Sequence, residues 1–137
     1  MSGPSESYYD EHPGLGVWAT IERATGACVG CHVLNHIQGE ELIQVGYILF
    51  KEGWGRGIAT EGAAAVLRYG FDDRGLSQIV AITDLGNVAS QRVLEKIGLH
   101  RRGERSFAHP AYAGQGPFAW FELDAAEWEL NSENRKS

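Results

Sequence analysis

The sequence predicts a mixed α/β domain with a mainly antiparallel sheet and a central β-α-β crossover. Three short apolar stretches come first, separated by turns, which is typical of antiparallel strands. A glycine-punctuated turn then joins a strand to a helix, and the β-branched segment at residues 78–85 lies between two helical patterns. A strand between two helices in this order predicts the crossover. The 137 residues suffice for one domain with one core.

The expected elements follow the order β β β α β α β β, with a short helix at the end. A flexible lead over residues 1–14 and a polar tail over residues 131–137 flank one domain at residues 15–130. We expect strands at residues 16–23, 27–35, 42–50, 78–85, 102–107 and 118–123, and two long helices at residues 58–72 and 88–97.

Turn chemistry and side-chain size support the first half of this order. The Ala-Thr-Gly of residues 24–26 fits a short hairpin turn between the first two strands. In the first helix, apolar residues recur at i, i+4, i+5 and i+8, which predicts one buried stripe. Its small residues Gly62, Ala63 and Gly70 allow the helix to lie close on a sheet.

Capping residues support the second half. Asn87 is a typical N-cap residue, and Gly98 has the residue type preferred just after a helix. Asp124 with Glu127 three residues later resembles a capping box, which predicts the start of the short final helix.

Charge and composition exclude several classes of function. The net charge of −6 argues against a general nucleic-acid binder, because such proteins are usually basic. No apolar run reaches membrane-spanning length, and the polar, acidic N-terminus lacks the apolar core of a secretory signal. We therefore expect a cytoplasmic protein without a membrane partner.

Cys28 and Cys31 form a C-x-x-C motif. A zinc site would need two further ligands at suitable spacing, and the sequence has no second pair of this kind. The motif lies in a predicted strand, where residues i and i+3 point to opposite faces. We interpret the two residues as small core thiols and expect no metal.

The glycine turn predicts an anion site. Gly53, Gly55 and Gly57 lack Cβ atoms, so a ligand can approach the backbone closely. The helix that follows presents unpaired N–H groups at the positive end of its dipole, which suits a pyrophosphate. A plain strand-to-helix connection has the same composition. The turn lacks the Lys-Ser/Thr of a P-loop, which counts against a nucleotide-binding protein.

Two segments, GWGRGIATE at residues 53–61 and NVASQRVLEKIGL at residues 87–99, together resemble the GNAT superfamily of acyl-CoA N-acyltransferases. The similarity is strongest to the branch that includes the ribosomal-protein N-terminal acetyltransferases, and it covers roughly residues 16–130. Glu52 replaces the Gln or Arg of the family pattern, and Leu99 replaces its usual Phe. Neither replacement removes a backbone N–H.

The resemblance implies acetyl-CoA as the acyl donor. Its pantetheine arm would add beside the third strand through main-chain hydrogen bonds, and Asn87 would bind the pantetheine amides in addition to its capping role. Arg56, Arg92 and Lys96 would contact phosphates, or else are solvated surface charges. The full set of implied cofactor residues is Leu49, Phe50, Trp54, Gly55, Arg56, Gly57, Ile58, Ala59, Asn87, Ser90, Arg92 and Lys96.

The implied reaction is direct attack of a free amine on the thioester in a ternary complex. A general base must deprotonate the amine, and the third strand's amides can stabilise the thioester oxygen. Ser90 is the preferred proton donor for the departing thiolate, with Tyr112 as an alternative. Glu41 and His109 are candidate bases, although an exposed turn carboxylate and a loop histidine are the plainer interpretations.

The resemblance also implies a strand and one or two helices ahead of the first hairpin, which wall the acceptor groove. Too few residues precede Val17 to supply them, so we expect a GNAT-like fold without these elements. A partner subunit in a homodimer can complete the groove. The expected function is transfer of an acetyl group to a primary amine of a small molecule or a peptide N-terminus. The alternative is a non-catalytic acyl-CoA-binding module.

Overall fold

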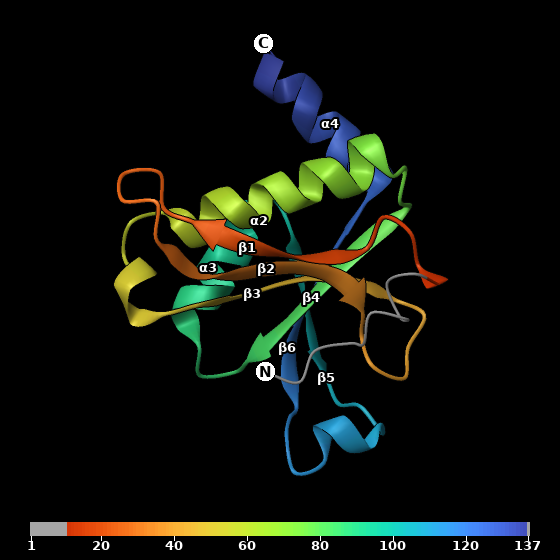
Figure 1. The fold of residues 1–137 in the computed structure, drawn as a ribbon. Coiled ribbons are helices and arrows are strands. Elements are labelled where there is room, and N and C mark those ends of the chain that lie inside the picture. The colour runs from red at the N-terminus through yellow and green to blue at the C-terminus, as the bar shows by residue number, and fades with distance from the viewer. Residues whose placement is uncertain (1–10, 137) are drawn as a thin grey trace.

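The structure confirms the predicted mixed α/β fold (Figure 1). It is a computed structural model that describes residues 11–136, with side chains through residue 131, so most of the expected lead lies outside the described residues. Within this range, six strands form one sheet in the order β1-β2-β3-β4-β6-β5. The strands are β1 (Gly16–Ile21), β2 (Cys28–His36), β3 (Ile43–Leu49), β4 (Gln78–Asp84), β5 (His100–Arg105) and β6 (Phe118–Asp124).

The helices agree with the predicted order, with shifted ends. The first helix is divided into α2 (Ile58–Arg68) and a π-helical turn, η2 (Tyr69–Asp73), and the second is α3 (Val88–Lys96). The final helix, α4 (Ala125–Lys136), is longer than the short helix expected. Two 3-10 turns, η1 (Lys51–Gly53) and η3 (Pro110–Tyr112), complete the described elements. In residues 11–136, no helix has the length and apolar character needed to cross a membrane.

The predicted caps are present. Asn87 Oδ1 accepts a hydrogen bond from Ser90 N at 3.1 Å, which caps α3. The capping box of α4 is reciprocal, because Glu127 N donates to Asp124 Oδ1 and Asp124 N donates to Glu127 Oε1. Each cap satisfies N–H groups that the helix leaves unpaired, so the positions of these two helix starts follow from local sequence.

One face of the sheet carries the main core. Side chains of α2 (Ala63, Val66, Leu67), Leu94 of α3 and its C-cap residue Ile97 pack into one buried cluster with the sheet. The sheet residues of this cluster are Leu34, Val45, Ile79, Ala81, Ala119, Phe121 and Leu123. Both helices therefore cover the same face. The opposite face of β4 and β6 is covered by a smaller cluster, in which the segment around η3 packs on Val80 and Trp120.

The two cysteines correct the sequence-based interpretation. Strand β2 bulges where it pairs with β1, so Cys28 lies opposite Ile21 and Cys31 lies opposite Ala19. The extra residue of the bulge puts both cysteines on the same face of the strand, not on opposite faces. Cys28 is exposed and Cys31 is half-buried, so they are not core thiols. Among the described residues, no three His, Cys, Asp or Glu side chains are grouped to hold a metal ion.

Gly30 provides a test of the β2–β3 packing. It has φ +149°, and an added Cβ would overlap the carbonyl oxygen of Ile48 on β3. We expect Gly30→Ala to lower the free energy of unfolding by about 2–4 kcal/mol, because backbone on one strand must move. Gly26→Ala is the control, since Gly26 has φ +74° and open space around it, and should cost about 1 kcal/mol. Equal losses in urea denaturation would contradict the proposed overlap.

Candidate functional site

A cleft opens where strands β3 and β4 separate. Strand β3 pairs with β2 along its whole length, but its parallel pairing with β4 is confined to Gln44 opposite Val80. Beyond Gln44 the two strands diverge, and in Figure 1 their C-terminal ends point to different parts of the molecule. The cleft has a volume of about 740 Å³ and is lined by Tyr47, Ile48, Leu49, Gly53, Trp54, Gly55, Gly57, Ile58, Ala59, Thr60, Asn87, Ala89, Ser90 and Val93.

The glycine loop, residues 53–57, forms one wall of this cleft. Gly55 and Gly57 have φ values of +75° and +74°, and an added Cβ on either would meet no atom within 4 Å. Gly57 is the N-cap of α2, so the N–H groups of Ile58, Ala59 and Thr60 have no acceptor within the helix. The unpaired N–H groups of the helix start therefore lie in the cleft lining at the positive end of the helix dipole, which is an arrangement that binds anions.

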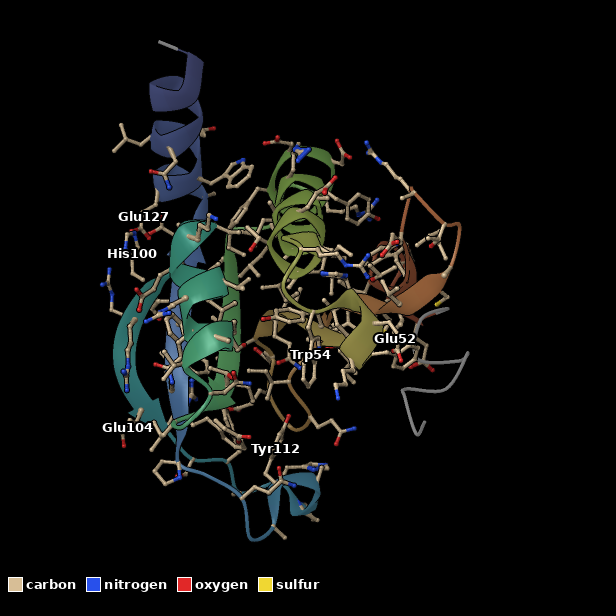
Figure 2. All side chains as sticks on the ribbon, turned by 90° about the vertical axis from the view of Figure 1, so that its left-hand side faces the viewer. Glu52, Trp54, His100, Glu104, Tyr112 and Glu127 are labelled. Atoms are coloured by element: carbon tan, nitrogen blue, oxygen red, sulfur yellow. The ribbon has the colours of Figure 1, made fainter. Side chains whose placement is uncertain are left out.

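The opposite wall is the start of α3. The side-chain oxygen of Asn87 is used in capping, which leaves its amide N–H₂ group available on the cleft surface. Of the predicted cofactor residues, Leu49, Trp54, Ile58, Ala59 and Ser90 also line the cleft, and Trp54 donates its indole N–H to Leu49 O at 3.0 Å. Figure 2 shows Trp54 between η1 and α3.

Tyr47 joins the two walls and was not predicted. Its hydroxyl donates to Ser90 Oγ at 3.3 Å, from the middle of β3 to the first turn of α3. This pair links β3 to α3 across the cleft, so two hydroxyl groups lie together there. The alternation of side chains along β3 places Tyr47 on the same face as Val45 and Leu49. This alternation is the sequence feature from which Tyr47 could have been predicted.

Arg56 has a different environment from the one expected. Its guanidinium pairs with Glu22 Oε2 at 2.5 Å and also donates to the carbonyl oxygen of Glu52. Hydrogen bonding and charge from Arg56 hold the pKa of the Glu22 carboxyl below its usual value. Arg56, Phe50, Arg92 and Lys96 do not line the cleft.

The candidate bases and Tyr112 lie in another place. His109 accepts a hydrogen bond from Ala111 N through Nδ1 at 3.0 Å and packs near Gly39, which is in the turn between β2 and β3. Tyr112 contacts Phe107 and Phe118, and burial raises its pKa. Glu41 is exposed in the same turn as Gly39. Figure 2 shows Tyr112, which belongs to η3, away from Trp54, and none of the three residues lines the cleft.

Comparisons with known proteins agree with this geometry. The sequence pattern of the Acetyltransferase (GNAT) domain matches residues 5–100. The chain belongs to the GNAT acetyltransferase family. It is 38% identical over 89 residues to YkkB of Bacillus subtilis, an uncharacterised protein. The alignment covers 64% of this chain and 52% of YkkB. A GNAT-family acetyltransferase structure from Bacillus anthracis aligns with TM-score 0.68 and 26% identity, over 88% of this chain and 72% of that one.

A fungal protein is also similar to the chain. The FsC-acetyl coenzyme A-N(2)-transacetylase of Aspergillus fumigatus is 33% identical over 95 residues, which is 64% of this chain and 40% of the fungal protein. The chain spans about half the length of the curated relatives it matches.

The cleft fits acetyl-CoA, the acyl donor of GNAT enzymes. The open space beside Gly55 and Gly57, next to the unpaired N–H groups at the start of α2, suits a diphosphate. The edge of β3 beyond Gln44 has no strand partner within residues 11–136, so its main chain can pair with the amides of a pantetheine arm. Asn87 adds a side-chain amide at the opposite wall.

Behind the glycine loop lies a buried histidine. His32 is 3% exposed, and its Nε2 lies 3.2 Å from Ala59 O while its Nδ1 lies 2.7 Å from Thr20 Oγ1. The carbonyl of Ala59 can only accept, so Nε2 carries the proton and Nδ1 accepts from the Thr20 hydroxyl. Burial lowers the pKa of His32, and burial likewise lowers the pKa of His36.

These shifts predict a pH dependence of stability. Between the lowered pKa of a folded histidine and about 6.5 in the unfolded chain, the unfolded chain binds more protons. We therefore expect the free energy of unfolding to fall as the pH falls below about 6.5, and His32→Gln to flatten this slope. Urea denaturation at several pH values measures the slope, and NMR titration of His32 checks its pKa. An ordinary titration of His32 would contradict the prediction.

Proposed function

We propose that this chain is an acetyl-CoA-dependent N-acetyltransferase that acts on a primary amine of a small molecule or a peptide N-terminus. One observation carries the proposal: the amide-rich glycine loop and the unpaired edge of β3 line the same cleft. The first suits a diphosphate and the second suits a pantetheine arm. The name of the Aspergillus relative, which includes acetyl coenzyme A, supports the same acyl donor.

Different residues of the cleft would bind different parts of acetyl-CoA. Backbone N–H groups of residues 55–60 would bind the diphosphate, and main-chain groups of Tyr47 to Leu49 with the Asn87 amide would bind the pantetheine. Trp54 would cover the ligand at the loop side. Arg92 and Lys96, on the exposed face of α3, would interact with phosphates only over a longer range.

Acetyl-CoA supplies an acetyl thioester, and the chain's residues would move two protons. The amine nitrogen forms a bond to the acetyl carbon while the carbon–sulfur bond breaks, so CoASH and an N-acetyl product leave. The departing sulfur requires a proton, and Ser90 would donate it while taking up the proton of the Tyr47 hydroxyl that donates to the Ser90 oxygen. Solvent would return a proton to Tyr47 and accept the proton that the base takes from the amine. A base removes one proton from the amine, and the candidates are Glu41, His109 and a water molecule.

The proposal extends to the family branch, the cellular location and the oligomeric state of the chain. The Asn-x-x-Ser and Glu-Lys-x-Gly segments of α3 support membership of the ribosomal-protein N-terminal acetyltransferase branch. A cytoplasmic location and a homodimer, in which a partner subunit completes the acceptor groove, are part of the same proposal.

A second candidate is a non-catalytic acyl-CoA-binding module. It is favoured by the position of Glu41, His109 and Tyr112 outside the cleft wall. Both candidates require binding of CoA, and only the enzyme releases CoASH when an amine is added. Screening amines, aminoglycosides and peptides for CoASH release therefore separates them.

The diphosphate position is tested by Gly57→Glu. The new carboxylate would enter the anion site and repel a diphosphate, so acetyl-CoA should no longer raise the melting temperature of the variant. Gly57→Lys is the matched control, because it has the same left-handed strain of about 1 kcal/mol without the repulsion, and acetyl-CoA should still stabilise it. An unchanged thermal shift in Gly57→Glu would refute the assignment of this loop.

The proton donor is tested by Ser90→Ala and Tyr47→Phe. We expect Ser90→Ala to lower kcat by about 100-fold, the usual contribution of a general acid, with little change in CoA affinity. Tyr47→Phe keeps the ring and should lower kcat less, and the double variant should resemble Ser90→Ala because the two hydroxyls act together. Steady-state kinetics with calorimetry of CoA binding measures both. A normal kcat in Ser90→Ala would remove Ser90 from the mechanism.

A further inference from the structure

We propose that the β1–β2 hairpin positions the glycine loop for the diphosphate, and that Thr20, Glu22 and His32 are positioning residues for cofactor binding. The inference rests on the proposed function, because it concerns the same cleft. It assigns a role to residues that line neither the diphosphate position nor the reacting atoms.

The hairpin holds the chain on both sides of the loop and in its middle. Before the loop, Phe50 N donates to Val29 O at 2.7 Å, and Gly53, the first residue of the loop, packs on the Val29 side chain. In the middle, Arg56 pairs with Glu22. After the loop, His32 donates to Ala59 O. The hairpin therefore contacts this segment at every third residue, at positions 50, 53, 56 and 59.

The His32 contact fixes the first turn of α2. The imidazole is held by Thr20 on β1 through Nδ1 and by Ala59 on α2 through Nε2, so its orientation is determined at both nitrogens. Gly62, one turn further along α2, faces the ring, and an added Cβ there would overlap it. The helix can approach the hairpin closely only because residue 62 has no side chain.

The Glu22 contact gives Arg56 a structural role. The guanidinium links Glu22 in the hairpin to the carbonyl oxygen of Glu52, just before the loop. Arg56 does not line the cleft, and its two contacts restrain the segment between the neighbouring glycines Gly55 and Gly57. Glycines lose more conformational freedom on ordering than other residues, so holding them in place before ligand arrives favours binding.

The His32 contact and the Glu22–Arg56 contact can be tested separately by their effects on CoA binding. His32→Leu removes both hydrogen bonds at similar size and should weaken CoA binding about tenfold, whereas His32→Gln keeps a donor near Ala59 and should recover part of it. Glu22→Gln and Arg56→Gln should weaken CoA binding equally, and the double variant should add nothing. Val80→Ala, in the core of the opposite face, is the control for general loss of stability.

Three measurements test the proposal. Calorimetry gives the CoA affinity, and NMR titration gives the affinity for pantetheine. Because pantetheine lacks the diphosphate, its affinity should differ between the variants and the wild type by less than about twofold. Hydrogen exchange of the amides of residues 54–60 in the ligand-free protein should be faster in His32→Leu and Glu22→Gln, and unchanged in Val80→Ala.

The outcomes distinguish this inference from the proposed function. If Glu22→Gln tightens CoA binding while Arg56→Gln weakens it, Arg56 is a direct phosphate ligand and the positioning role is wrong. If His32→Leu changes neither CoA affinity nor amide exchange, the hairpin does not position the loop. If the wild-type chain binds no CoA, the proposed function fails, and the amide exchange of the free protein still decides the role of the hairpin.

Discussion

The single register pair between β3 and β4 is the constraint on which the structure depends. Within residues 11–136, Gln44 lies opposite Val80 and no further pair is formed, so the backbone groups on one edge of β3 have no strand partner in this part of the chain. Unpaired backbone groups are costly when buried, so this edge must face water or a ligand. The cleft, the access to α3 and the position of the glycine loop all follow from this divergence of two parallel neighbours.

Apolar packing compensates for the missing backbone pairing. Helices α2 and α3 place side chains in one cluster that spans both halves of the sheet, from Leu34 and Val45 to Phe121 and Leu123. Each such fully buried side chain contributes about 1.5–3 kcal/mol relative to an exposed one. The sheet can therefore separate on one side of Gln44 without losing its integrity, and the Tyr47–Ser90 hydrogen bond spans the opening.

The sequence predicted those features that depend on residues close together in the chain, such as helix caps and turns. The Asn87 cap, the Asp124–Glu127 box and the strand-turn-helix around Gly57 all appear where expected. Contacts between distant segments were missed, because the Arg56–Glu22 pair and the position of His109 require the strand order and loop path. The cysteine error has the same origin, since one extra residue in β2 reverses the side-chain alternation.

The close fit of Gly62 against His32 links two positions thirty residues apart in the chain. Any side chain at residue 62 must be accompanied by a smaller one at residue 32, or the helix must move away from the hairpin. Homologous chains with alanine at the position of Gly62 should therefore have a smaller residue than histidine at the position of His32. Such paired substitutions would mark the homologues in which other contacts hold the loop.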